Sequence, residues 1–314
     1  MRYTIQVWTL DSYPENKIEI DQPKFDELRH AQKCLSVALA IEENYDLLLS
    51  NYLDLEKECL NVAADYMVRT STEYTDLFDI RLAFNRRIVN FLTSTRLYKD
   101  QITNHIEAWI PNDKNTLEKV KSLFLVESKA CFEYRFMETL RNHVQHHSLA
   151  VRSILVERKL TSFVEEEREW EFKTRIFTNK LNFDNDKSLN KQDKQVLNEM
   201  PEEVDLMYAA RVYVESISKV HCDIRELLAR KFGESRRLIS MQIEDYKKIS
   251  NGDSTGLYAV CSILKEPINE VIEKFPLLLD WDDVRIRLSK KNERLINLRK
   301  RFVSSSVYKK PVVP

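Results

Sequence analysis

The stretch YDLLLSNYLDLEKECLNVAADY at residues 45–66 carries a strong helical pattern. Apolar side chains recur in it at alternating intervals of three and four residues, at Tyr45, Leu48, Tyr52, Leu55, Cys59, Val62 and Tyr66. This spacing places them along one face of an α-helix of about six turns, and such a face needs another helix against it. The pattern predicts a helix over residues 28–66 and favours packing within the chain over an intermolecular coiled coil.

A second helical segment follows this first one. Apolar residues keep helical spacing over residues 77–102, and Thr70–Glu73 offers residues suited to the helix start. We expect the helix to end near Trp109, because Pro111 disfavours helical backbone in the residue before it.

A third helix is predicted after the proline. Asn115 and Glu118 have the spacing of a capping box at its start. We expect the helix to break near Glu127 and to continue as far as Val144. Three helices with short connections predict an antiparallel bundle.

The remaining segments complete a mainly α fold with a small inserted β element. Residues 3–10 alternate as a strand does, and residues 18–20 pair back on it in the simplest arrangement. Residues 151–160 and 170–183 are rich in β-branched and aromatic side chains and predict a β-hairpin, whereas residues 182–195 have the composition of a polar linker.

The C-terminal part returns to helix. We expect a helix over residues 204–249, a short strand over 257–264 and a basic helix over about 281–302. These patterns divide the chain into an N-terminal strand plus helical bundle at 1–150, a β-hairpin and linker at 151–190, and a C-terminal helical portion with one short strand at 191–314. The C-terminal helices either form a second domain or pack back on the bundle.

Composition narrows the class of protein. The 314 residues are 43% hydrophobic and 32% charged with only three glycines, which argues against disorder and against an all-β sandwich. No apolar run reaches the roughly 18–20 residues of a membrane span, and the N-terminus does not resemble a signal peptide, so we expect a cytoplasmic protein that does not enter membranes. Five scattered cysteines without CxxC spacing fit reduced thiols.

Positive charge is concentrated near the C-terminus. The net charge of the chain is −1, but residues 285–310 hold ten Lys and Arg and one acidic residue, Glu293. Such a segment suits contact with phosphate backbones, and its first cations are the candidate RNA-binding residues. These are Arg285, Arg287, Lys290, Lys291 and Arg294. The alternative is a solvated face whose charges pair with Glu165–Glu167.

The segment with the most chemical potential is RNHVQHH at residues 141–147, which holds half of the six histidines. On a helical wheel, Arg141 lies only about 40° from Met137, on the apolar side. A guanidinium near an apolar face needs a partner, a cleft or an interface. His146 lies about 140° around from Arg141, so a single undistorted helix cannot aim both groups at one phosphate.

The sequence ETLRNHVQH at residues 138–146 resembles the motif of the HEPN superfamily, the higher eukaryotes and prokaryotes nucleotide-binding domain. In that motif an Arg precedes a polar residue and, after four to six intervening positions, a His. Arg141, Asn142 and His146 match these positions, and His147 matches the longer spacing. Glu138 corresponds to an acidic residue often found one turn upstream. The resemblance covers at most the helical N-terminal half.

The resemblance implies RNA cleavage without a metal or other cofactor. Arg141 would bind the scissile phosphate, His146 would transfer protons and Asn142 would orient one of them, with Glu138, His143 and His147 as auxiliary residues. The 2′-hydroxyl would attack its own phosphate and leave a 2′,3′-cyclic phosphate. Two protomers commonly line one cleft in this superfamily, which implies a homodimer. Toxin or anti-phage activity and a neutralising partner protein are further implications.

Other readings of the same residues remain open. Members of the superfamily without cleavage activity make a non-catalytic nucleotide-binding or helical interaction protein the alternative. His143 and His147 have a spacing that suits metal ligands, but Val144 stands where a zincin has its Glu. The three histidines also suit a solvated helix end. His221–Asp223 is interpreted as core or surface packing, and no phosphate-binding glycine loop occurs.

Overall fold

The computed structural model describes residues 1–8, 16–69, 73–160, 169–184, 186–263, 265 and 270–304, and it confirms a mainly α protein with small antiparallel sheets. The helices are α1 (Gln22–Val68), α2 (Tyr74–Trp109), α3 (Lys114–Ala130), α4 (Phe132–His146), α5 (Lys191–Glu199), α6 (Leu206–Ile249) and α7 (Asp280–Lys291). The strands are β1 (Arg2–Val7), β2 (Lys17–Ile20), β3 (Ser153–Leu160), β4 (Trp170–Asn179), β5 (Glu203–Asp205), β6 (Leu257–Ile263) and β7 (Glu270–Pro276).

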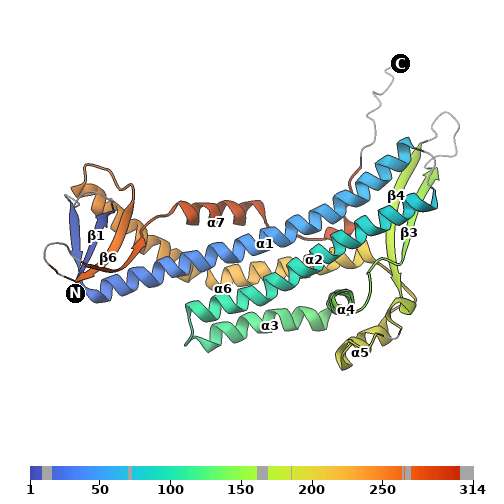
Figure 1. Cartoon of the computed structure of the whole chain (residues 1–314), viewed down its shortest axis with the longest axis horizontal. Coiled ribbons are helices and arrows are strands. Elements are labelled where there is room, and N and C mark those ends of the chain that lie inside the picture. Colours follow the sequence, from blue (N-terminus) through green and yellow to red (C-terminus); the bar gives the residue numbers. More distant parts are fainter. Residues whose placement is uncertain are drawn as a thin grey trace, which may run out of the picture.

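Three long helices, α1, α2 and α6, run beside one another along the long axis of an elongated molecule, with one sheet at each end (Figure 1). α1 begins earlier than its apolar pattern indicates, because the Asp21 side chain accepts a hydrogen bond from the Lys24 N–H at 2.9 Å. Pro23 lies in the first turn, where a missing N–H costs nothing. The seam residues Tyr45 and Leu55 are buried within the chain.

The third predicted helix is divided in two by the extended backbone of Cys131, four residues after the expected break. Its start also differs from the expectation. The cap is Asp113, whose carboxylate accepts the Thr116 N–H at 3.0 Å, and not the Asn115–Glu118 pair. The N-cap of α2 is Glu73, whose N–H donates to Asp76 at 3.0 Å, whereas residues 70–72 lie outside the described ranges.

The sheets join distant parts of the chain. β1 lies between β2 and β6 in the order β2-β1-β6-β7, with Tyr3 opposite Cys261. The predicted hairpin is present as the antiparallel pair β3–β4, with Ile154 opposite Ile176, and β5 adds a third strand. The expectation of one short strand after residue 190 was therefore wrong, since β5 and β7 accompany β6.

Two other local predictions need correction. Residues 182–195 are not a continuous linker, because a 3₁₀ turn ends at Phe183 and α5 begins at Lys191. The basic helix ends at Lys291 instead of continuing to Phe302. Between Asn292 and Ser304, the last described residue, the chain forms a short 3₁₀ turn at residues 298–300.

The C-terminal helices pack back on the N-terminal ones. One hydrophobic cluster contains Leu48 of α1, Ile176 of β4 and Ile224 of α6, so the three expected segments share a core. A smaller cluster lies under the sheet of β1 and β6 and includes Ile5 and Leu257. Within the described ranges, no helix has both the length and the apolar character that a bilayer crossing requires.

Candidate functional site

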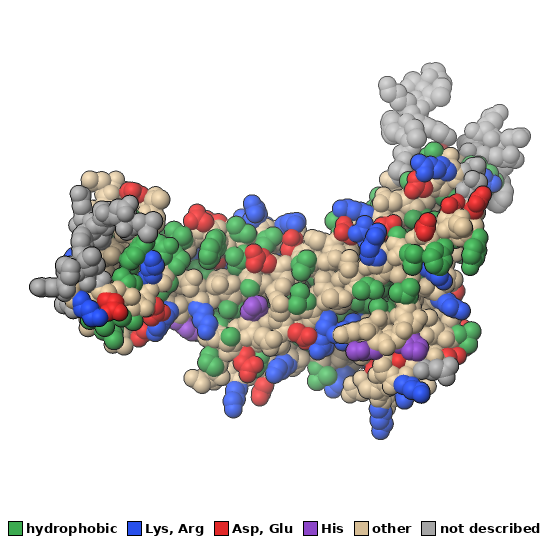
Figure 2. Space-filling view, in the orientation of Figure 1, with side chains coloured by type: hydrophobic (Ala, Val, Ile, Leu, Met, Phe, Trp, Pro, Cys, Tyr) green, Lys and Arg blue, Asp and Glu red, His purple; other side chains and the backbone are tan. Residues whose placement is uncertain are grey.

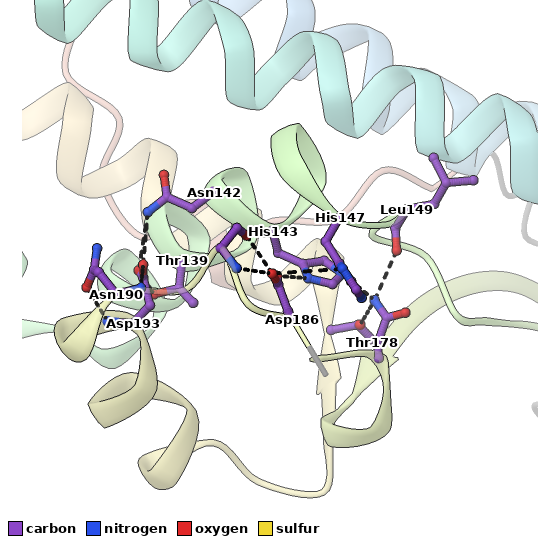
Figure 3. A network of polar contacts seen from close by, with 11 residues as sticks. Thr139, Asn142, His143, His147, Leu149, Thr178, Asp186, Asn190 and Asp193 are labelled. Carbon is purple, nitrogen blue, oxygen red and sulfur yellow. Dashed lines mark hydrogen bonds and ion pairs between the residues drawn. The ribbon is translucent and has the colours of Figure 1, made fainter. Parts of the chain in front are cut away.

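The histidine-rich end of α4 meets α5 and the loop that precedes it, far from the β1–β6 sheet (Figures 1 and 3). The two helices run antiparallel. Asp193, near the start of α5, contacts Thr139 and Asn142 of α4, whereas Glu199 at the end of α5 pairs with Arg135 at 2.6 Å. The N-terminal half of α5 therefore lies against the part of α4 that carries the predicted motif.

Asp193 is the residue that joins the two helices. Its buried carboxylate accepts hydrogen bonds from the Thr139 hydroxyl at 2.9 Å, from the Asn142 amide at 3.2 and 3.3 Å, and from the Asn190 N–H at 3.2 Å. The Asn190 side chain in turn accepts the Asp193 N–H at 3.0 Å, which completes a capping box. One carboxylate thus starts α5 and holds Asn142 in place.

Asn142 connects Asp193 to Arg141. With its amide nitrogen on Asp193, its amide oxygen accepts a hydrogen bond from Arg141 Nη1 at 2.9 Å. Asn142 and His146 are four residues apart and share a helix face, so this bond draws the guanidinium around α4 toward that face. Arg141 is half-buried and, in the part of the chain that the structure describes, forms no ion pair with a carboxylate.

His143, and not Arg141, occupies the buried side of α4. Its ring is fully buried, with Nδ1 2.7 Å from Asp186 and Nε2 3.4 Å from the Asn182 amide nitrogen (Figure 3). Burial lowers the pKa of His143, and the hydrogen bond to Asp186 opposes this shift only in part. The neutral ring therefore donates from Nδ1 and accepts at Nε2, and both nitrogens are engaged in structural contacts.

Asp186 anchors the loop before α5. Burial alone would raise the pKa of its carboxyl, but hydrogen bonds from Ser188 and His143 outweigh it and lower that pKa. The Ser188 N–H donates to Asp186 at 2.9 Å, and Nδ1 of His147 lies 3.9 Å from the same carboxylate. His146 and His147 are exposed. Histidine side chains reach the surface over α4 and α5, with Lys and Arg side chains close by (Figure 2).

The acidic residue of the motif has other partners. Glu138 accepts a hydrogen bond from Tyr213 and pairs with Lys99 at 2.8 Å, so the structure does not bring it to Arg141. The structure places Arg141 and Asn142 in direct contact and leaves His146 at the surface of the same helix end.

Of the five candidate cations of the basic segment, two form ion pairs with carboxylates, and three form none with the residues that have a described position. Arg285 donates to Asp282, and Lys291 pairs with Asp46 at 2.8 Å. Arg287, Lys290 and Arg294 are exposed. The alternative partners at residues 165–167 lie outside the described residues.

The other candidates have structural surroundings. His221 is buried in the core as expected, with Tyr98 on its Nδ1 at 2.9 Å. Among the residues with a described position, no group of three or more His, Cys, Asp or Glu side chains is arranged to hold a metal ion.

Sequence reasoning missed Asp186 and Asp193, because both fall in the segment interpreted as a linker. The signals that mark them are local: Asn190 and Asp193 have capping-box spacing, and Asp186 precedes Ser188 as in an Asx turn. No protein-family model, curated protein or solved structure matches this chain.

Proposed function

We propose that the chain is a HEPN-like, metal-independent endoribonuclease whose reaction centre is formed by Arg141, Asn142 and His146. The observation that supports this best is that Arg141 donates to an amide and forms no ion pair with a described carboxylate. The nearby carboxylates have other partners: Glu138 contacts Lys99, Asp186 contacts His143, and Asp193 contacts Thr139 and Asn142. A positioned guanidinium without an internal carboxylate suits an anion supplied from outside, such as a phosphodiester.

The chemistry follows from these groups. Arg141 binds the non-bridging oxygens of the scissile phosphate and stabilises the charge that develops on them. His146 accepts the proton of the 2′-hydroxyl, whose oxygen forms a bond to phosphorus. The bond from phosphorus to the 5′-oxygen breaks, and that oxygen takes a proton from the imidazole of His146, which was protonated in the first part of the reaction. The products are a 2′,3′-cyclic phosphate and a free 5′-hydroxyl.

A homodimer completes this proposal. On one helix Arg141 and His146 lie about 140° apart, and the bond to Asn142 closes only part of that angle. Two copies of α4 facing each other across a twofold axis bring the Arg141 of one protomer near the His146 of the other. Exposure of His146 and partial exposure of Arg141 leave both available for such a contact.

The first experiment measures cleavage of labelled single-stranded RNA with EDTA present. Arg141→Ala and His146→Ala should each lower the cleavage rate about 100-fold or more, as loss of a group that stabilises the transition state does. Matched controls are Arg86→Ala, at an exposed Arg of α2, and His105→Ala, at a half-buried His of the same helix. Equal cleavage by all four variants, or no cleavage by the unsubstituted protein, contradicts the catalytic proposal.

A second experiment tests the shared site. Arg141→Ala and His146→Ala proteins should each cleave very slowly alone, but in a mixed dimer one of the two sites retains both groups. Mixing should therefore restore about a quarter of the activity, because half of randomly formed dimers are mixed. No recovery after verified subunit exchange contradicts a site shared between protomers. RNA binding without cleavage by the unsubstituted protein supports the non-catalytic nucleotide-binding alternative.

A toxin or anti-phage effector of this kind predicts a cellular phenotype. Induced expression of the unsubstituted chain in bacteria should arrest growth, and expression of Arg141→Ala to the same level should not. Growth arrest by both proteins would show that toxicity does not depend on Arg141, which contradicts this proposal.

A further inference from the structure

We infer that the exposed side of α5 and the loop before it bind the phosphate backbone of single-stranded RNA. This surface, the α5 basic face, consists of Lys187, Lys191 and Lys194. The inference rests on the proposed function and names the surface that holds the substrate on either side of the scissile phosphate. The sequence gives no such indication, because these lysines lie in the segment interpreted as a linker.

The α5 basic face has positive charge that the protein does not neutralise. All three lysines are exposed, and none of them forms an ion pair with any residue that the structure describes. The two nearest carboxylates along the chain, Asp186 and Asp193, are buried and accept hydrogen bonds from inside the protein. Because these two carboxylates point into the protein, the exposed side of residues 187–194 has a net positive charge.

The position of the α5 basic face relative to Arg141 is set by hydrogen bonds. Lys191 and Lys194 stand on either side of Asp193 in the first turns of α5, and Asp193 holds Asn142, which holds Arg141. Lysines three residues apart on a helix are neighbours on its surface. Lys187 follows Asp186 directly, and that carboxylate contacts His143 and lies near His147. The three lysines therefore lie on the loop and the helix that contact the motif.

The chemistry of this face favours RNA over a compact anion. The ammonium groups extend from a loop and two positions of a helix, so they suit a chain of phosphates better than a single one. Gln192 and Gln195 are exposed among the lysines and can donate and accept hydrogen bonds with ribose hydroxyls or bases. The basic segment that begins at Arg285 within α7 is less suited to this role. Its contacts tie it to α1 and α6, and two of its five candidate cations are paired with carboxylates.

The experiment measures RNA affinity as a function of salt in protein that carries His146→Ala, so that bound RNA is not cut. The test variant adds Lys187→Ala, Lys191→Ala and Lys194→Ala. The control adds Lys114→Ala, Lys119→Ala and Lys121→Ala, which remove three exposed lysines of α3 and the same total charge. A third variant replaces the three test lysines with Arg.

Each phosphate contact to a single strand contributes about 0.7 to the slope of log Kd against log salt concentration. The test variant should lower this slope by up to about 2 and weaken binding by at least about 10-fold at moderate salt. The α3 control and the Arg variant should keep the slope of the parent protein. An equal loss in the test and control variants, or an unchanged slope in the test variant, overturns the inference.

Further outcomes separate this inference from the proposed function. If cleavage requires Arg141 but replacing the three lysines leaves the salt slope unchanged, the α5 basic face does not bind RNA. The nuclease proposal then stands. If the parent protein does not bind single-stranded RNA at all, both fail. Binding of duplex DNA with equal affinity and equal dependence on the lysines overturns the assignment to RNA.

Discussion

Two fully buried histidines of this protein sit against carboxylates in opposite electrostatic settings. His221 lies between Tyr98 at 2.9 Å and Glu42 at 3.4 Å, and Arg225 donates twice to the same Glu42, at 2.8 and 2.5 Å. His143 lies against Asp186 at 2.7 Å, and no guanidinium joins that pair in the described structure. The first cluster joins α1, α2 and α6, and the second borders the surface at the end of α4.

The difference lies in whether the cation of each region has a carboxylate as its partner. In the His221 cluster, the cation and the carboxylate neutralise each other inside the protein. At the end of α4, the carboxylates of Asp186 and Asp193 are satisfied by uncharged donors, and Arg141 keeps its full charge beside an amide. A buried histidine next to a carboxylate is therefore weak evidence of function by itself. The unpaired cation beside it carries more weight.

The largest effect we expect is on the sealed cluster. Burial would raise the pKa of Glu42, but hydrogen bonds from Arg225 and His221 lower it to about 2, so the carboxylate is charged. Arg225→Met leaves that charge buried without its main partner and should cost about 3–5 kcal/mol of unfolding free energy, measured by urea titration. RNA cleavage by the folded fraction should be retained.

The matched control lies on the same helix. Arg230 pairs with Glu234 at 3.4 Å, and both side chains are exposed, so Arg230→Met should cost less than about 0.5 kcal/mol. Similar losses for the two variants would show that the Glu42 cluster is not more strongly coupled than a surface pair.

The opposite pattern is expected at Arg141. Arg141→Met should lower RNA cleavage about 100-fold, which corresponds to about 2.7 kcal/mol of transition-state stabilisation. Its unfolding free energy should change by less than about 1 kcal/mol, because the guanidinium contributes one hydrogen bond at a partly exposed position. A large stability loss with unchanged cleavage would place Arg141 among the structural cations, with Arg225.

The contrast between these regions was only partly visible in the sequence. Periodicity predicted the long helices, because each has a continuous apolar face, and it predicted the β3–β4 pair. It could not predict β1 beside β6, since that pairing joins residues about 250 positions apart and leaves no local pattern. α5 was not predicted for another reason. It is short and polar, and only Asp193 and Val196 of its residues are buried, so it has no continuous apolar face.

The burial of His143 was missed because the apolar side of the helix was judged from Met137. His143 lies about 120° from Met137 on the helical wheel, outside the face that Met137 marks. Within α4 alone, Phe136, Leu140 and His143 follow helical spacing and share a buried face. The buried face of α4 is therefore wider than Met137 alone indicates, and it extends about 60° beyond Leu140 to His143.

A smaller effect is expected at Asp193, which we propose positions Asn142 and Arg141 without contacting the substrate. Asp193→Ala removes the acceptor of Thr139, Asn142 and the Asn190 N–H, and should cost about 1–3 kcal/mol of unfolding free energy. Cleavage should fall about 10-fold through kcat, since Asn142 no longer directs Arg141, with a smaller change in KM.

The control for this variant is Glu199→Ala at the other end of α5. Glu199 is exposed and pairs with Arg135, so its loss should cost less than about 1 kcal/mol and leave kcat unchanged. Asp193→Asn keeps an acceptor oxygen and should recover part of the lost kcat. If Asp193→Ala lowers stability and leaves kcat intact, Asp193 only builds the fold.

The smallest effect concerns the pH dependence of stability. The pKa values of His143 and His221 are both lowered by burial, so the folded protein resists protons that the unfolded chain accepts. Their contribution to stability is therefore complete above about pH 6.5 and is lost as the pH falls, by at most about 1.4 kcal/mol per pH unit for each ring. His143→Gln should flatten the decline between pH 7 and pH 5 in urea titrations.

This measurement also decides the charge of the pair at the end of α4. A neutral His143 that donates to Asp186 predicts the flattened profile. A protonated His143 held by Asp186 would have a raised pKa, and its stabilisation would be complete at low pH and lost as the pH rises. His143→Gln would then make the decline toward pH 5 steeper. A steeper profile would mean that Asp186 holds a cation as Glu42 does, and the electrostatic contrast between the two clusters would disappear.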